Sequence, residues 1–388
     1  MPTGIRSFAM RQSLRVEDTT TPSTYNDDDG AQGIRQPRDF TMSQTKLRAG
    51  IIGLGFIGGG DQVAGDRLGQ KVADLDGHHR SALSNHLRVE LVAGSSQDAG
   101  RRERFQQSTG ARTYADWRQM LAAENLDIVS IASMTPNHAE QTIGCVKAGV
   151  RAIYCEKPIA ATLAEAEAMV TACHRAGSLL VINHNRRFNP TYRQLSEFIT
   201  DSQLGDLITV SARWATGRLG NVGTHMIDAI RMLTRREVRA VSATLDMSAR
   251  PDCRGAEFRD PGGWAMLRMD GGLMGQISAP DYAKDPAEIC ISGSLGRAVV
   301  QGNAVRIDFW DGRGEHWPTP DSGVTSMDVA VSEIVAALDH GQPVRSTGED
   351  GLRSLEVIIA CHVSHERYAA WTELPLEQTE RQRVLQAG

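Results

Sequence analysis

Lys157 is the first residue whose type and position could serve chemistry. It stands in the tripeptide Glu156-Lys157-Pro158, directly after the apolar run 152–155. A lysine that leaves the carboxyl end of a buried strand can hydrogen-bond a substrate hydroxyl and take part in proton transfer. A lysine in this place is often only a solvated side chain, so the tripeptide gains meaning only beside other candidates.

His225 is the second candidate, within the segment 220–233. It lies four residues after Asn221 and three residues before Asp228. If the segment is helical, these spacings place the three side chains on one face, with two polar groups beside a titratable imidazole. We therefore interpret Lys157, His225, Asn221 and Asp228 as a candidate catalytic set. The alternative is a histidine paired with Asp228 on an exposed helix.

A glycine pattern precedes both candidates. Gly53, Gly55 and Gly58 form G-x-G-x-x-G directly after the apolar run 48–53. Glycines at this spacing permit a tight turn and let backbone N–H groups approach a pyrophosphate, so the pattern predicts a dinucleotide-binding turn. A glycine-rich turn without a ligand is the alternative. Ser96, at the end of the next strand, lies 38 residues beyond Gly58 (96 minus 58), which predicts an insertion over 59–76.

The residues after the second apolar run bear on the choice of dinucleotide. An Asp or Glu that binds the ribose of NAD is expected there, but the chain has Ser95 and Ser96, followed by Arg101 and Arg102. Hydroxyl groups do not repel a 2'-phosphate, and an arginine can pair with one. The sequence therefore favours NADP over NAD, unless both arginines merely solvate a helix.

The first half of the chain alternates strands and helices. Apolar runs over 48–53, 89–93, 128–133 and 152–155 are typical of buried parallel strands. Capping boxes at Asn137 with Glu140 and at Thr162 with Glu165 predict the starts of two helices. This alternation predicts a parallel sheet with right-handed crossovers, whose ligand lies at the carboxyl ends of the strands.

The second half has longer, alternating strands. They are expected over 207–214, 238–247, 264–269, 273–278, 289–291, 298–301 and 305–310, with a hairpin turn at 270–272 and two late helices. The predicted fold is thus an α/β Rossmann domain with a parallel sheet, followed by an α+β domain with a large, mostly antiparallel, open sheet. We assign 1–45 to a disordered N-terminal extension, 46–187 to the dinucleotide-binding domain and 188–388 to the second domain.

Bulk composition excludes several classes of partner. The 388 residues are enough for two domains, and a net charge of −5 provides no basic surface for nucleic acid or anionic membrane. The six cysteines lack metal-ligand spacing and no apolar run is long enough to span a bilayer. We expect a cytoplasmic protein with no metal, no nucleic-acid partner and no membrane partner.

Five motifs, taken in order, resemble the glucose-fructose oxidoreductase, inositol dehydrogenase and MocA family. They are G-L-G-F-I-G (53–58), T-P-N-H-A-E (135–140), E-K-P (156–158), N-R-R-F-N-P (185–190) and G-x-H-x-x-D (223–228), and the resemblance covers about 47–370. It implies a Rossmann domain joined to an α+β domain whose open sheet packs against other subunits in a homodimer or homotetramer.

The resemblance also implies roles for particular residues. Lys157 and His225 would flank the substrate carbinol beside the nicotinamide of NADP or NAD, with Arg187 and Trp214 near the substrate. The implied cofactor-binding residues are Gly53, Gly55, Phe56, Ile57, Gly58, Ser95, Ser96, Arg101, Thr135, Pro136, Asn137, His138, Glu156 and Lys157. Many members carry D-x-G-x-H, whereas this chain has Asn221 in place of the Asp. The carboxylate that would make His225 a stronger base is therefore missing.

The function implied is hydride transfer between the nicotinamide and a carbinol or carbonyl carbon of a sugar, polyol, inositol or sugar acid. His225, assisted by Lys157, would accept the hydroxyl proton. Two alternatives stay open. One is a glycosidase-like enzyme that keeps its NAD and works by oxidation and elimination, and the other is a non-catalytic sensor of a sugar and a dinucleotide.

Overall fold

The computed structural model describes residues 45–62, 75–215, 217–247, 258–280, 286–320 and 323–387. The predicted disorder of 1–45 and most of the predicted insertion 59–76 lie outside the described residues. Residues from Gln44 onward form one compact unit.

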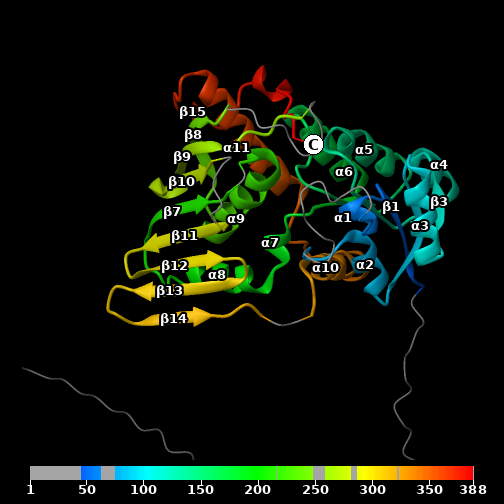
Figure 1. The fold of residues 1–388 in the computed structure, drawn as a ribbon, viewed down its shortest axis with the longest axis horizontal. Coiled ribbons are helices and arrows are strands. Elements are labelled where there is room, and N and C mark those ends of the chain that lie inside the picture. The colour runs from blue at the N-terminus through cyan, green and yellow to red at the C-terminus, as the bar shows by residue number, and fades with distance from the viewer. Residues whose placement is uncertain are drawn as a thin grey trace, which may run out of the picture. The chain divides into compact units, whose positions relative to one another are not determined.

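Six parallel strands form the first sheet, in the order β3-β2-β1-β4-β5-β6. Figure 1 labels β1 and β3 of this sheet among the helices that surround it. Their bounds are β1 Leu47–Ile52, β2 Val89–Ser95, β3 Arg112–Tyr114, β4 Ile128–Ile131, β5 Ala152–Cys155 and β6 Leu179–Ile182. Strands β4 and β5 are buried at every position, which explains their unbroken apolar runs. The order reverses between β1 and β4, and a ligand binds at such a switch point. The predicted Rossmann sheet is confirmed.

Helices connect these strands. They are α1 Phe56–Gly59, α2 His79–Asn85, α3 Ala99–Thr109, α4 Trp117–Ala123, α5 His138–Lys147 and α6 Leu163–Ala176. The capping box of Thr162 and Glu165 is present at the start of α6. The capping box predicted at Asn137 is wrong, because Thr135–Asn137 forms a 3-10 turn in which Asn137 already has a helical backbone and its side chain caps nothing.

Nine strands form the second sheet, in the order β14-β13-β12-β11-β7-β10-β9-β8-β15. Their bounds are β7 Leu207–Arg213, β8 Val238–Leu245, β9 Gly263–Met269, β10 Met274–Ala279, β11 Glu288–Gly293, β12 Gly296–Gln301, β13 Ala304–Phe309, β14 Gly314–Trp317 and β15 Thr372–Glu373. Every pair is antiparallel except β7 with β10. The mostly antiparallel sheet is confirmed, as is the hairpin between β9 and β10.

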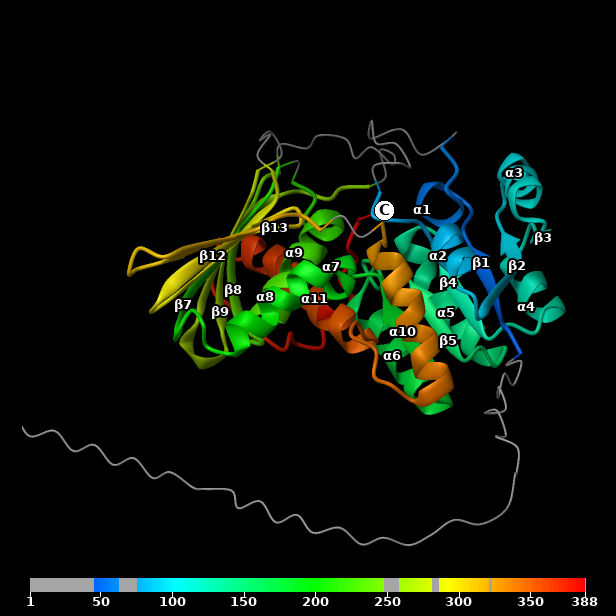
Figure 2. The ribbon, with the colours of Figure 1, turned by 90° about the horizontal axis from the view of Figure 1, so that it is seen from below.

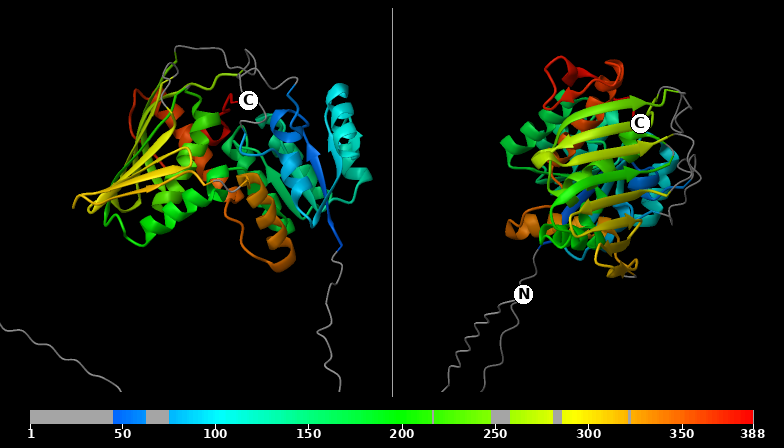
Figure 3. Two further views of the ribbon diagram at one scale, coloured as in Figure 1. Left: turned by 60° about the horizontal axis from the view of Figure 1, so that its bottom comes forward. Right: turned by 90° about the vertical axis from the view of Figure 1, so that its left-hand side faces the viewer.

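The second sheet has one covered face and one open face. Burial alternates along β9, so every second side chain points away from the core. Helices α8 Pro190–Thr200, α9 Thr224–Thr234 and α11 Gly348–Glu366 pack on the inner side, and no helix of the described chain lies over the outer face (Figure 3). The outer face is therefore an exposed sheet surface.

The two late helices pack differently. Helix α11 contacts both β8 and α6, whereas α10 Ser326–His340 packs against α2 and α7 Asn185–Phe188 (Figure 2). Met327 and Val331 of α10 belong to one hydrophobic cluster with Ile51 of β1. The chain thus returns to complete the layer around the first sheet. The predicted domain boundary at 187/188 falls inside α7 and remains a prediction.

Candidate active site

The turn between β1 and α1 is built for close backbone approach. Gly53 has a φ of +97°, and a Cβ there would lie 2.5 Å from the carbonyl oxygen of Ala132. A Cβ on Gly58 would lie 1.9 Å from the carbonyl oxygen of Gly53. Any side chain at either position would force the turn open. The glycine turn therefore fits the pyrophosphate of a dinucleotide, which needs a backbone free of side chains.

Arg101 of α3 reaches the same turn. A Cβ on Gly55 would lie 2.9 Å from Arg101 Nη1, and Arg101 Nε lies 3.6 Å from Asp61 Oδ2. Arg102 instead donates to the carbonyl oxygen of Ser96 (2.7 Å). Of the two predicted arginines, the structure thus brings Arg101 to the glycine turn and directs Arg102 to the backbone.

The other residues predicted to bind the dinucleotide near the glycine turn are either buried or partly exposed. Ser95 is buried at the end of β2, where its carbonyl oxygen accepts the N–H of Gly53 (2.9 Å). Phe56 and Ile57 are partly exposed at the start of α1. Ser96 is also partly exposed, next to the α3 N-terminus. These three partly exposed residues remain accessible to a ligand.

The loop after β4 is tied to the loop that carries Lys157. His138 is buried, and its Nδ1 and Nε2 lie 2.9 Å and 3.2 Å from the carbonyl oxygens of Pro158 and Ser133. Burial lowers the pKa of His138 below its ordinary value, although the two carbonyl groups oppose that shift. The imidazole therefore bridges two loops, while Pro136 and Asn137 remain exposed at the edge of the sheet.

Glu156 is a buried carboxylate behind Lys157. Its Oε1 accepts the Asn183 amide (2.6 Å) and lies 3.1 Å from His79 Nε2. Burial alone would raise the pKa of Glu156, but the hydrogen bond and charge of His79, the charge of Lys157 and the hydrogen bond of Asn183 lower it to about 2. The carboxylate is thus ionised and fixed. No motif in the sequence pointed to His79 or Asn183.

The structure brings Lys157 and Asn221 together, although 64 residues separate them in the chain. Lys157 Nζ donates to Asn221 Oδ1 (3.2 Å) and to the Asn221 carbonyl oxygen (3.4 Å). Lys157 leaves β5, whereas Asn221 belongs to η4, a π-helical turn over Leu219–Gly223. The side-chain Nδ2 of Asn221 is buried without a hydrogen-bond partner in the described part of the chain.

His225 is the second residue of α9, which follows that turn directly. Burial, followed by the charges of Lys157 and Arg186 and the neighbouring His184, lowers the pKa of His225 well below its ordinary value. The ring centroids of His225 and His184 are 6.0 Å apart in an edge-on arrangement. The His225 imidazole is therefore neutral, which is the state that can accept a proton.

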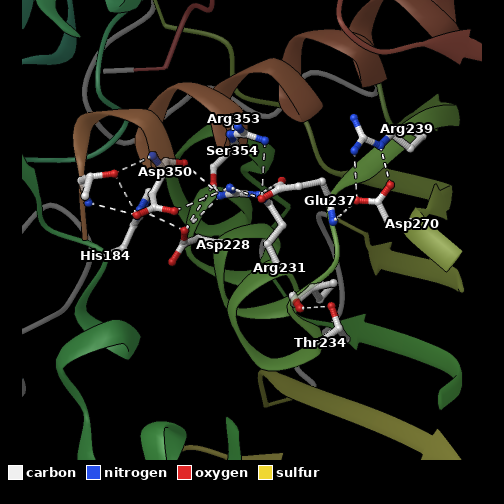
Figure 4. Close-up of polar contacts among 12 residues, drawn as sticks. His184, Asp228, Arg231, Thr234, Glu237, Arg239, Asp270, Asp350, Arg353 and Ser354 are labelled. Atoms are coloured by element: carbon white, nitrogen blue, oxygen red, sulfur yellow. Dashed lines mark hydrogen bonds and ion pairs between the residues drawn. The ribbon is translucent and has the colours of Figure 1, made fainter. Parts of the chain in front are cut away.

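Asp228 lies elsewhere than the sequence pattern indicated. Its fully buried carboxylate accepts Arg187 Nε (2.8 Å) and lies 3.4 Å from both Arg231 Nη1 and His184 Nδ1. Figure 4 shows Asp228 between His184 and Arg231, beside Asp350 of α11. Burial alone would raise the pKa of Asp228, but these cationic and imidazole groups lower it. The carboxylate joins α7, α9 and α11.

The expected place of Asp228 beside His225, on a helical face shared with Asn221, is therefore wrong. Asn221 lies in the π-helical turn outside α9, and Asp228 faces Arg187 rather than His225. Arg187 in turn contacts Asp350 (2.9 Å), so its guanidinium is held between two carboxylates.

Trp214 packs against the π-helical turn. It is buried, its indole N–H donates to the carbonyl oxygen of Gly217 (2.6 Å), and a Cβ on Gly223 would lie 3.0 Å from its ring. Trp214, which was expected near the substrate, thus packs against the π-helical turn that contains Asn221.

The described residues contain no group of three or more His, Cys, Asp or Glu side chains able to hold a metal ion. None of their helices combines the length and the apolar character that crossing a bilayer requires.

Two known domain families match the chain. Residues 47–184 match the oxidoreductase family with an NAD-binding Rossmann fold, and residues 192–299 match the GFO/IDH/MocA C-terminal domain. The chain belongs to the GFO/IDH/MocA family. The family inferred from the five motifs is thus confirmed.

Relatives of this GFO/IDH/MocA chain include dehydrogenases of sugars and inositol. It is 32% identical to the D-apiose dehydrogenase of Paraburkholderia graminis over 53% of this chain and 54% of that enzyme, so it spans about half the length of that relative. It is 24% identical to the myo-inositol 2-dehydrogenase of Thermotoga maritima over 80% of this chain and 93% of that enzyme.

A solved structure shares the fold. The WlbA dehydrogenase from Bordetella pertussis, in complex with NADH and UDP-GlcNAcA, superposes with a TM-score of 0.69 and 25% identity over 86% of this chain and 100% of that one. Both layers of the present chain therefore have a counterpart in a dehydrogenase crystallised with NADH.

Proposed function

We propose that this protein is an NAD(P)-dependent oxidoreductase that acts on a carbinol or carbonyl carbon of a sugar, polyol, inositol or sugar acid. The observation that carries the proposal is the contact between Lys157 Nζ and Asn221 Oδ1 (3.2 Å), with a neutral His225 at the start of the next helix. In alcohol oxidation an ammonium group can bind the substrate oxygen and an imidazole can accept the hydroxyl proton.

The proposed mechanism assigns one task to each residue. Gly53, Gly55 and Gly58 would hold the pyrophosphate, and a bound nicotinamide would supply the acceptor or donor of hydride. Lys157 donates a hydrogen bond to the substrate oxygen and fixes its position. His225 accepts the proton of that hydroxyl through a ring nitrogen, and it returns the proton when the reaction runs toward the alcohol.

The charge of the site bears on the substrate class. Lys157 and Arg186 both contribute positive charge near His225. The ionised Glu156 offsets part of this charge, but Asn221 adds no negative charge and the carboxylate of Asp228 is occupied by Arg187. A substrate carboxylate would be attracted to this surplus of positive charge, so we expect sugar acids among the better substrates.

We further propose NADP as the preferred dinucleotide. Arg101 lies at Gly55, and the end of β2 carries Ser95 and Ser96 instead of a carboxylate. A guanidinium at the glycine turn can pair with the 2'-phosphate that distinguishes NADP.

We also propose that the protein forms a homodimer or homotetramer in the cytoplasm. Residues 46–187 would bind the dinucleotide, and residues 188–388 would bind the substrate and form the contacts between subunits. Ile208, Trp264 and Met266 are exposed on the second sheet, and exposed apolar side chains on an open sheet support a contact between subunits. The five described cysteines are free, in keeping with a reducing compartment. Light scattering of wild-type protein and of Met266→Lys would test the association.

Absorbance of the nicotinamide tests the reaction itself. Purified protein is mixed with NAD or NADP and with a panel of sugars, polyols, inositols and sugar acids, and reduction is followed directly. We expect turnover with at least one class. Glycoside cleavage without net cofactor reduction would favour the elimination mechanism, and binding without turnover would favour a sensor; either result contradicts the proposal.

A further inference from the structure

The π-helical turn η4, which carries Asn221, is held by one short segment before β9. Gly220 N–H donates to Asp260 Oδ1 (2.6 Å) and Asn221 N–H donates to Asp260 Oδ2 (2.7 Å). Leu219 N–H donates to the carbonyl oxygen of Pro261 (3.0 Å). A single carboxylate, 8% exposed, thus takes two successive backbone donors of the turn.

The segment 383–387 packs against the same turn, next to Asp260. Leu385 N–H donates to the carbonyl oxygen of Ala161 (2.8 Å), four residues after Lys157. The carbonyl oxygen of Gln386 accepts the N–H of Arg259 (3.0 Å), the residue before Asp260. This segment therefore links the loop that follows Lys157 to the residues before β9, which include Asp260.

Gly220 is the point where these parts meet. A Cβ on Gly220 would lie 2.8 Å from Ala387 Cβ and 3.0 Å from both Leu385 Cδ2 and Asp260 Oδ1. Leu385 and Ala387 are buried. The turn is thus packed against the segment at a distance that only glycine permits.

We propose that Asp260 is a positioning residue for catalysis. Together with Leu385 and Ala387 it forms a clamp that fixes the π-helical turn and thereby sets Asn221 against Lys157. The catalytic consequence rests on the function proposed above. The existence of the clamp does not.

The physical need for such a clamp follows from the turn itself. A π-helical turn is a rare conformation that often occurs at functional sites. The N–H groups of Gly220 and Asn221 are buried, so they need acceptors that stay in place. Asparagine at position 260 would offer one carboxamide oxygen to two donors and turn its own NH2 toward the second. Asp260→Asn therefore releases one side of the turn with little change in volume.

The first test is kinetic. Asp260→Asn should lower kcat roughly 10- to 100-fold, the scale for a small misplacement of a reacting group, while the dissociation constant of the dinucleotide stays unchanged. Gly220→Ala keeps the Asp260 carboxylate but crowds it together with Ala387 and Leu385, so it should displace the turn and lower kcat in the same way, which keeps the test valid if one variant folds poorly. Glu356→Gln is the matched control, because Glu356 accepts the backbone N–H of Leu376 outside the turn, and it should retain wild-type kcat.

The second test needs no turnover. The chain has five lysines, so carbon-13 dimethylation gives few NMR signals, and the Lys157 signal is assigned by its loss in Lys157→Met. We expect this signal to move in Asp260→Asn and Gly220→Ala and to stay in Glu356→Gln. An unmoved signal, or a moved signal with kcat within about threefold of wild type, overturns the proposal. A wild-type protein inactive on every substrate refutes the proposed function, and the lysine signal then decides on the clamp alone.

Discussion

Replacing Asp228 by Asn should destabilise the protein by about 3 kcal/mol, the lower end of the range for breaking a buried ion pair. The substitution keeps the size of the side chain but removes its negative charge. The Asp228 side chain is 0% exposed, so this charge is fully buried. Arg187 and Arg231, with side chains 12% and 2% exposed, cannot regain water in the folded state. Arg187 retains Asp350, and Arg231 retains Glu237 and Asp350. These remaining carboxylates are the reason for choosing the lower end of the range.

Equilibrium urea denaturation, followed by tryptophan fluorescence and by circular dichroism, measures this loss. Asp311→Asn is the matched control, because Asp311 pairs with Arg313 in an exposed position and an exposed pair contributes little. A free energy of unfolding for Asp228→Asn equal to that of Asp311→Asn would refute the reasoning about the buried network.

The same pair of measurements gives a pH dependence. The folded-state pKa of Asp228 is lowered, whereas the unfolded carboxyl titrates near its ordinary pKa of about 3.9. The stabilisation is therefore fully present above that unfolded pKa and is lost as the pH falls through the lower folded-state pKa. The difference between wild type and Asp228→Asn should shrink on acidification below about pH 4, and a difference that grows there would contradict the assignment.

Three further substitutions test the site. Lys157→Met should reduce kcat/KM by about 10² or more while dinucleotide binding, read by fluorescence, stays nearly intact; near-normal turnover would remove its role. Arg101→Ala should weaken the binding of NADP by roughly 1.5 to 3 kcal/mol and the binding of NAD much less. Equal losses of affinity for the two dinucleotides would count against a 2'-phosphate contact. Asn221→Asp places a carboxylate near His225, raises the pKa of that imidazole and moves the acidic limb of the kcat/KM profile to higher pH, each unit representing about 1.36 kcal/mol. A limb that stays in place would mean that another group titrates there.

The sequence predicted the parts of the fold whose signals are local. Buried parallel strands give unbroken apolar runs, and the glycine turn after β1 has a fixed spacing, so both could be read directly. Strands β3 and β15 were missed because they have three and two residues, too few to show a period. Strand β6 was also missed, because a four-residue apolar run directly after a helix does not by itself distinguish a strand from a buried helix segment. Strand β14 is exposed along most of its length, which leaves no hydrophobic pattern to detect.

The site was predictable only as a list of residues. The sequence named Lys157, Asn221 and His225, but the contact between Lys157 and Asn221 depends on how β5 meets η4. Asp228 was misjudged because spacing within a helix does not tell which neighbour faces the side chain, and Arg187 comes from another helix. Asp260 belongs to no motif, and its role arises from two backbone donors 39 and 40 residues earlier.

The return of α10 to the first layer has a consequence for biosynthesis. Its Met327, Ala330 and Val331 complete the hydrophobic cluster that contains Ile51 and Tyr154. Ser326, the first residue of α10, follows Ile182 of β6 by 144 residues (326 minus 182). At roughly 5 to 20 residues per second, a ribosome needs about 7 to 30 s to add that stretch. During that interval the nascent parallel sheet is already synthesised while the surface that awaits α10 remains uncovered, which makes this chain a natural client for chaperones that bind apolar surfaces during translation.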